Sequence, residues 1–228
     1  MSRPFCIWEN IYIIGSSEIS HPYDCCVYLI DVGELVLIDS GAGRSFGRLV
    51  DNIESLELAP EKISTVIVTH RHIDHIGSLA ELRQNYGARI IAHSLDAEAI
   101  ETGKSTGADA YGVEYEPCQV DVKLEGAEEK LAFGGQEFIA LHIPGHTRGS
   151  IAIYTDVGGK RVLFGQDIHG PYEAMWGGEI DKAIISLQSL ADLKADILCE
   201  GHFGIYQPAK EVKNYIEGYL RQLERSWG

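Results

Sequence analysis

The sequence predicts an α+β fold in which two β-sheets are flanked by helices. Short runs of β-branched and aromatic residues fall into two groups along the 228 residues, and each group is joined to helical segments. Residues 35–39 have a loose echo at 161–165, which indicates two similar β-units. Several runs are apolar throughout, as expected for strands that are covered on both faces of a sheet.

The first half of the chain alternates strand and helix patterns. Residues 25–31 and 35–38 flank a turn at Gly33 and predict a hairpin. Residues 45–56 carry Phe46, Leu49, Val50 and Ile53 with helical spacing. The other elements expected here are a strand at 7–14, a strand at 63–68, a helix at 78–86, a strand at 89–92 and a helix at 95–101.

The second half begins after a polar, glycine-bearing segment at residues 102–118, which we interpret as an insert or lid. The expected strands lie at 120–124, 136–142, 151–155, 161–164 and 197–200, and the expected helices at 182–193 and 209–226. No low-complexity segment and no obvious linker interrupts the pattern. The sequence therefore predicts a single domain over residues 1–228.

The charge and cysteine content narrow the class of protein. A net charge of −15 disfavours nucleic acid and anionic membrane surfaces as partners. The sequence contains no run of about 18 apolar residues, so no membrane span is predicted. Five cysteines without a Cys-x-x-Cys pair, together with an N-terminus that lacks an apolar signal stretch, predict a reducing, cytoplasmic compartment.

Four metal-competent side chains, His70, His72, Asp74 and His75, directly follow the buried strand expected at 63–68. On a strand, residues i and i+2 point to the same side, so His70 and His72 can converge. Imidazole and carboxylate ligands suit Zn²⁺ and related divalent ions. Without a metal, such a cluster would incur desolvation and like-charge costs. The sequence therefore predicts a metal site at this strand end.

The cluster has the form His-x-His-x-Asp-His, which resembles the signature of the metallo-β-lactamase superfamily. Four further loops resemble family motifs in the same order along the chain: Asp39-Ser40-Gly41, residues 144–150, Gly165-Gln166-Asp167 and Gly201-His202. The resemblance spans nearly the whole chain. It implies an αββα four-layer sandwich, with two mixed β-sheets flanked by helices. Gln166 and the single glycine Gly77 depart from the usual pattern without removing a ligand.

The resemblance also implies a ligand set for two divalent metal ions. The first ion takes His70, His72 and His146, the second takes Asp74, His75 and His202, and Asp167 bridges both. Zinc is the default metal, and iron and manganese accept the same ligands. Asp74 is the candidate catalytic residue that steers the nucleophile or passes a proton. Asp39 is the candidate that orients a ligating imidazole, although it could act in the turn alone.

The implied function is a dinuclear metal-dependent hydrolase, in which a metal-bridging hydroxide cleaves a thioester, ester or lactone of a small molecule. The ligand set and the loop at 144–150 resemble those of hydroxyacylglutathione hydrolases. The alternatives are an N-acyl homoserine lactonase and an iron-dependent persulfide dioxygenase. The aspartate at position 167 disfavours a β-lactamase, which usually has cysteine there, and the acidic charge disfavours a nuclease.

Three residues that follow Asp167 are candidate substrate contacts: His169, Tyr172 and Trp176. Tyr172 is also the candidate for the tyrosine that lactonases place near the bridging aspartate. Packing inside the loop explains Tyr172 and Trp176 equally well. The expected partner is a small molecule, and the oligomeric state stays open, with a homodimer as one option.

Overall fold

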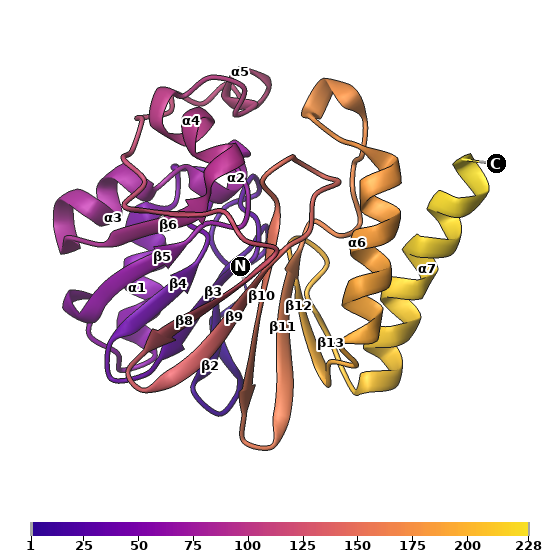
Figure 1. Cartoon of the computed structure of the whole chain (residues 1–228). Helices are drawn as coiled ribbons and strands as arrows, with labels where there is room; N and C mark the ends of the chain where they lie inside the picture. Colours follow the sequence, from indigo (N-terminus) through magenta and orange to yellow (C-terminus); the bar gives the residue numbers. More distant parts are fainter. Residues whose placement is uncertain (1, 228) are drawn as a thin grey trace. The chain divides into compact units, whose positions relative to one another are not determined.

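The computed structural model describes residues 2–227 and divides the chain into two compact units. The first unit runs up to Glu125 and includes Phe133–Gln136. The second unit consists of Gly126–Ala132 and the chain from Glu137 onward. Each unit has a β-sheet and helices of its own (Figure 1). The expectation of a single domain stays a prediction.

The sheet of the first unit has seven strands whose order in space follows their order in the chain. They are β1 (Phe5–Trp8), β2 (Ile11–Gly15), β3 (Val27–Asp31), β4 (Leu35–Ile38), β5 (Ile63–Ile67), β6 (Arg89–His93) and β7 (Val122–Leu124). Strands β1 to β4 pair antiparallel, and β4 to β7 pair parallel, so the sheet is mixed. The apolar runs at β3 and β4 are almost wholly buried, as their composition requires.

The helices of the first unit cover this sheet with apolar side chains. They are α1 (Phe46–Ser55), α2 (Ile73–Ile76), α3 (Leu79–Tyr86), α4 (Ser94–Thr102), α5 (Ala108–Tyr111) and the 3₁₀ turn η1 (Pro60–Lys62). Leu49 and Ile53 of α1 are buried in one cluster with Leu37 and Val66 of the sheet. Each such side chain contributes roughly 1.5–3 kcal/mol by leaving water.

The sheet of the second unit has six strands in the order β13-β12-β11-β10-β9-β8. Their bounds are β8 (Glu128–Phe133), β9 (Gln136–His142), β10 (Ile151–Val157), β11 (Lys160–Gln166), β12 (Ile197–Glu200) and β13 (Ile205–Tyr206). The pairs β9–β10 and β10–β11 are antiparallel, whereas β11 and β12 are parallel. Strands β9, β11 and β12 therefore run in the same direction and end at the same edge of the sheet.

Two long helices pack on the sheet of the second unit. Helices α6 (Ile180–Asp192) and α7 (Ala209–Trp227) lie side by side (Figure 1). Leu187 and Leu190 of α6 share a buried cluster with Ile216 of α7 and with Leu163 and Leu198 of the sheet. A short 3₁₀ turn, η2 (Ala174–Trp176), precedes α6. No helix within residues 2–227 is long and apolar enough to cross a membrane.

The predicted fold class, two mixed sheets flanked by helices, is confirmed, with differences in individual elements. The strand expected at 7–14 is two strands, because Glu9 has a φ of 47° and turns the chain between β1 and β2. Residues 102–118 contain the short helix α5. Strand β8 and the two-residue β13 were not among the expected strands. Strand β8 lies at a sheet edge and begins with the charged residues Glu128, Glu129 and Lys130, a composition typical of protected edges.

Candidate metal centre

The histidine motif of the first unit folds into a compact cluster directly after β5. His72 is the N-cap of the four-residue helix α2, which carries Asp74 and His75, and all four metal-competent side chains are buried. The ring centroid of His70 lies 4.8 Å from that of His72 and 3.9 Å from that of His75. His75 Nε2 lies 3.6 Å from Asp74 Oδ2. The structure thus brings the four predicted ligands of this unit together.

Asp39 holds this cluster from the end of the neighbouring strand β4. Its carboxylate accepts hydrogen bonds from the backbone N–H and the hydroxyl of Thr69, at 2.8 and 2.7 Å. It lies 2.7 Å from His75 Nδ1, which donates to it and leaves Nε2 with the lone pair. Strands β4 and β5 are parallel, so Asp39 and the histidine motif meet at one edge of the sheet. A residue that orients a ligating imidazole requires this geometry.

The Asp39 side chain is fully buried. Burial raises the pKa of the Asp39 carboxyl, and the contact with His75 and the hydrogen bonds from Thr69 oppose this shift. Cys25, Asp39 and His75 have ligand atoms within 4.8 Å of one another. Burial raises the pKa of the Cys25 thiol well above its ordinary value of 9.0. Cys25 therefore presents a neutral thiol to the Asp39–His75 pair.

Backbone packing explains why glycines follow Asp39 and the histidine motif. The N–H of Gly77 donates to the carbonyl of Gly41 at 2.7 Å. A Cβ at Gly77 would lie 2.1 Å from the carbonyl carbon of Ala42, so only glycine fits at this position. The backbone N–H of Ser40 donates to the carbonyl of His75 at 2.8 Å. The loop after β4 thus supports α2 through its backbone, and Gly41 allows this with a φ of 71°.

The second unit brings three predicted ligands together at one sheet edge. His146, Asp167 and His202 follow β9, β11 and β12, the strands that end at that edge. Asp167 Oδ2 lies 3.4 Å from His146 Nε2 and 3.3 Å from His202 Nε2. One carboxylate oxygen therefore lies within 3.4 Å of the ligand atoms of two imidazoles. A carboxylate in this position can join either imidazole in ligating a cation.

The loop that carries His146 is held by its own side chains. His146 Nδ1 donates to the carbonyl of Pro171 at 2.7 Å, so Nε2 faces Asp167. The Ser150 hydroxyl accepts from the backbone N–H of Thr147 at 3.0 Å and lies 2.8 Å from the Thr147 hydroxyl. A Cβ at Gly145 would lie 2.6 Å from the Cα of Ala183 in α6. These contacts explain the residue types of the motif at 144–150.

The three candidate substrate residues lie differently. The His169 side chain is 17% exposed, and its Nδ1 lies 2.7 Å from Glu200 Oε1. Tyr172 is buried, its hydroxyl donates to the carbonyl of Ile168, and burial raises its pKa. Trp176 is half-buried in η2, next to the exposed Met175. The hydroxyl proton of Tyr172 is therefore held in a hydrogen bond within the loop. The His169 ring is instead oriented by the buried carboxylate of Glu200.

Sequence reasoning missed three groups that hold the predicted ligands. Thr69 lies inside the motif, but its bonds to Asp39 depend on the pairing of β4 with β5. The acceptor at Pro171 is a backbone carbonyl, which no side-chain pattern can reveal. Glu200 ends the apolar run of β12. A carboxylate directly after apolar residues of a buried strand is the feature of the sequence that could have indicated its role.

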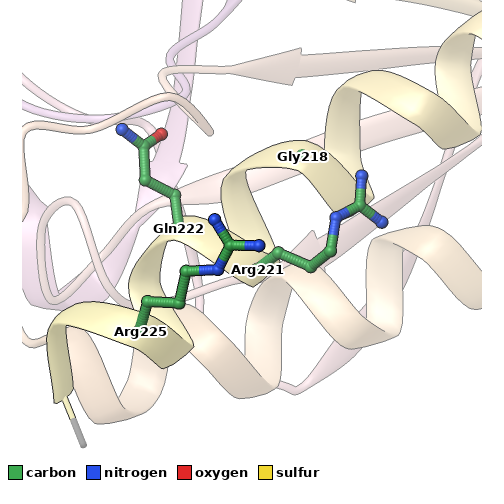
Figure 2. Close-up of a pocket in the computed structure, with 4 residues that line it drawn as sticks. All are labelled: Gly218, Arg221, Gln222 and Arg225. Carbon is green, nitrogen blue, oxygen red and sulfur yellow. The ribbon is translucent and has the colours of Figure 1, made fainter.

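The residues of both units fit divalent metal ions. Their donors are imidazole nitrogens and carboxylate oxygens, which zinc and other first-row metals accept. His75 and His146 each have Nδ1 engaged by an acceptor, which prepares Nε2 for a metal. A surface pocket on α7 differs in kind, because Gly218, Arg221, Gln222 and Arg225 line it (Figure 2). Guanidinium and amide groups of that type suit anions rather than metals.

Comparison with known proteins gives a consistent family. Residues 22–202 match the family model of the Metallo-beta-lactamase superfamily. The chain is 26% identical to the probable metallo-hydrolase YflN of Bacillus subtilis, over 82% of each chain. It is 28% identical to the hydroxyacylglutathione hydrolase GloC of Haemophilus influenzae, over 70% of this chain and 71% of that protein.

Solved structures resemble the whole fold. The class B3 di-zinc metallo-beta-lactamase LRA-12 from an Alaskan soil metagenome superposes with a TM-score of 0.82. The alignment covers 99% of this chain and 93% of that chain, at 24% sequence identity. At this identity the likeness concerns the fold, and the chemistry has to be argued from the side chains.

Proposed function

Because the chain belongs to the metallo-beta-lactamase superfamily, a family of metal-dependent hydrolases, we propose that it is a dinuclear hydrolase of a small-molecule thioester or ester. The observation that carries this proposal is the position of Asp167 Oδ2, within 3.4 Å of Nε2 of both His146 and His202. The proposed metal ligands are His70, His72, Asp74, His75, His146, Asp167 and His202. Zinc is the first choice, with iron or manganese as alternatives.

Two divalent ions, when bound, would lower the pKa of a water molecule and polarise the substrate carbonyl. The chain's own residues prepare this chemistry. Asp39 accepts a hydrogen bond from His75 Nδ1–H and so keeps Nε2 available to a metal. Asp74 Oδ2 lies 3.6 Å from that nitrogen, so its carboxylate is close enough to the proposed ligands to hold a proton during hydrolysis. Asp74 is therefore the proposed catalytic residue.

The preferred substrate is a thioester of the hydroxyacylglutathione type. The hydroxyacylglutathione hydrolase GloC of Haemophilus influenzae aligns over similar shares of both chains, 70% and 71%. An N-acyl homoserine lactone is the second choice, because the Tyr172 hydroxyl is committed to the carbonyl of Ile168. Persulfide oxidation is the third choice and would use a single iron. A β-lactam is disfavoured, since the likeness to β-lactamases reaches only the fold.

A substrate panel with metal analysis tests this proposal. The purified protein is loaded with zinc, manganese or iron, and its metal content is measured by mass spectrometry. We expect the highest kcat/KM with S-lactoylglutathione, lower values with an N-acyl homoserine lactone, and complete loss after chelation. Oxygen uptake with glutathione persulfide, without hydrolysis of any ester or thioester, would contradict the proposal.

We also propose that the chain acts on a small molecule in the cytoplasm, without a nucleic-acid or membrane partner. The net charge of −15 opposes binding to phosphate backbones and anionic lipids. The five cysteines form no disulfide within residues 2–227, which suits a reducing compartment. A phosphodiester and an RNA substrate in the panel test the first part directly.

A further inference from the structure

A buried carboxylate joins two loops of the second unit. Glu200 is the last residue of β12 and is fully buried. Its Oε1 lies 2.7 Å from His169 Nδ1, and its Oε2 accepts the backbone N–H groups of His202 and Phe203, at 2.7 and 2.9 Å. A carboxylate in a dry interior requires such hydrogen bonds to compensate its desolvation. Glu200 therefore fixes the position of the loop that carries His202 and, through His169, of the loop that carries Asp167.

This contact also determines the chemistry of the His169 ring. A carboxylate only accepts hydrogen bonds, so His169 Nδ1 must be the donor. In the neutral imidazole, Nε2 then carries the lone pair. Among residues 2–227, no hydrogen bond engages this Nε2, and the side chain is 17% exposed. In that tautomer His169 presents a hydrogen-bond acceptor, Nε2, on a side chain that is partly exposed.

The ring lies beside the proposed ligands of the same unit. Its centroid is 5.4 Å from that of His202, with an interplanar angle of 84°, and 4.7 Å from that of Phe203, at 76°. His202 Nε2 in turn lies 3.3 Å from Asp167 Oδ2. The neighbouring Phe203 is 58% exposed and offers an apolar surface next to the acceptor. The acceptor and the aromatic face together suit a short acyl group that carries one polar donor.

We propose that His169 is a specificity-determining residue whose Nε2 accepts a hydrogen bond from a hydroxyl group on the acyl part of the substrate. Glu200 is the positioning residue that fixes the ring and its tautomer for this contact. This inference rests on the proposed function and deepens it, because it selects hydroxyacyl over simple acyl compounds. The bond is made to a substrate donor, so a substrate without that hydroxyl loses it.

The first test uses two non-hydrolysable thioether analogues, one with the hydroxyl group and one without it, in calorimetric binding to the metal-loaded protein. We expect the wild-type protein to bind the hydroxyl analogue about tenfold more tightly, the effect of one hydrogen bond. His169→Asn keeps a side-chain N–H that can donate to Glu200 but has no nitrogen at the position of Nε2. We expect this variant to lose the tenfold preference while it retains the wild-type metal content.

The second test exchanges the donor and the acceptor in the contact between His169 and residue 200. Glu200→Gln places an amide N–H within reach of His169 Nδ1, which then accepts and leaves the proton on Nε2. Nitrogen NMR of the metal-free protein should report the Nδ1–H tautomer in the wild type and the Nε2–H tautomer in this variant. Because Nε2 then carries a proton and cannot accept a hydrogen bond, we expect Glu200→Gln to lose the preference for the hydroxyl analogue. Glu211→Gln, at an exposed position of α7, is the matched control and should change neither.

Equal binding of the two analogues by the wild type, or an unchanged preference in His169→Asn, would overturn the inference. An Nε2–H tautomer in the wild type would also overturn it. Failure of the proposed function is recognised separately, because the wild-type protein would then hydrolyse neither S-lactoylglutathione nor S-propionylglutathione, whatever the analogues show.

Discussion

At the scale of single residues, three imidazoles of the candidate site are oriented through Nδ1 by acceptors of different strength. His75 donates to the buried carboxylate of Asp39, and His169 to that of Glu200. His146 donates to a neutral backbone carbonyl, that of Pro171. A charged acceptor makes the opposite ring nitrogen a stronger base than a neutral one does. We therefore expect His75 Nε2 to bind a cation more strongly than His146 Nε2.

The buried side chain of Gln166 is expected to lower the free energy of unfolding. It is buried with a φ of 50°, and neither atom of its amide has a hydrogen-bond partner among residues 2–227. An unsatisfied buried polar group destabilises a protein by about 1–3 kcal/mol. Gln166→Met keeps the shape and removes the polar atoms. We expect this variant to unfold at a higher urea concentration, with a gain of about 1 kcal/mol in the metal-free protein.

The control for this measurement is Gln222→Met, at an exposed position of α7, which should leave the free energy of unfolding unchanged. A loss of stability in Gln166→Met would contradict the prediction, since it would mean that the amide is satisfied in solution.

The residues of the candidate site could be predicted where a side chain carries the chemistry. All seven proposed ligands and Asp39 lie in motifs that the sequence alone displays. The acceptor at Pro171 could not be predicted, because a carbonyl oxygen is common to every residue. The roles of Thr69 and Glu200 depend on which strands are neighbours, and no local pattern contains that information.

At the scale of elements, segment 102–118 is fastened to the histidine motif. The Arg71 side chain donates to the carbonyl of Ser105 at 2.9 Å and pairs with the buried Asp96 at 3.3 Å. The backbone N–H of Ile73 donates to the carbonyl of Thr106 at 2.8 Å. The segment is therefore attached to its own unit through Arg71 and Ile73, the variable positions of the motif.

Arg71→Ala tests this attachment. Removal of the guanidinium breaks the side-chain bonds to Ser105 and Asp96 and leaves the backbone N–H of Arg71 bonded to Asp96. Hydrogen bonds to charged groups contribute about 1.5–3 kcal/mol each. We expect faster amide exchange in residues 103–113 and little change in the sheet strands, measured by hydrogen–deuterium exchange. The exposed Arg89→Ala is the control. Unchanged exchange in Arg71→Ala would show that the backbone bond at Thr106 suffices.

A second element contact has a predictable pH dependence. Arg83 of α3 forms two hydrogen bonds of 2.8 and 2.7 Å to Asp121, which also accepts the backbone N–H of Ile90 at 2.8 Å. The Arg83 hydrogen bonds hold the pKa of Asp121 below its ordinary value of 3.8. Because the folded pKa is the lower one, the stabilisation is present above pH 3.8 and is lost as the pH falls through the folded pKa.

We therefore expect Asp121→Asn to be less stable than the wild type at pH 7 and equally stable below the folded pKa. Urea unfolding over a pH series measures the difference, and Asp51→Asn, on the exposed face of α1, is the control. A difference that persists at the lowest pH would assign the effect to packing rather than to charge.

Elements were predictable where periodicity is strong and long. The hairpin of β3 and β4, helix α1 and the closing helix α7 follow from apolar spacing. The break between β1 and β2 depends on the left-handed conformation of Glu9, a residue without an intrinsic preference for it. Strand β8 lacks the apolar character of its neighbours, because an edge strand needs to bury little.

At the scale of the whole molecule, the metal-competent residues of each unit and the residues that orient them lie at the ends of strands. Asp39 and the histidine motif follow the parallel strands β4 and β5 of one sheet. His146, Asp167 and His202 follow β9, β11 and β12, which run in one direction in the other sheet. The same topology that builds two mixed sheets therefore gathers the metal-competent residues within each unit.

The proposed hydrolase requires that the chain binds two divalent metal ions and that Asp167 is a ligand of both. The most direct measurement is the metal content per chain, by mass spectrometry after dialysis, for the wild type and for Asp167→Ala of verified fold. We predict two ions in the wild type and loss of most of the metal in the variant. Two ions retained in Asp167→Ala, or none bound by the wild type in the presence of excess zinc, would contradict the account.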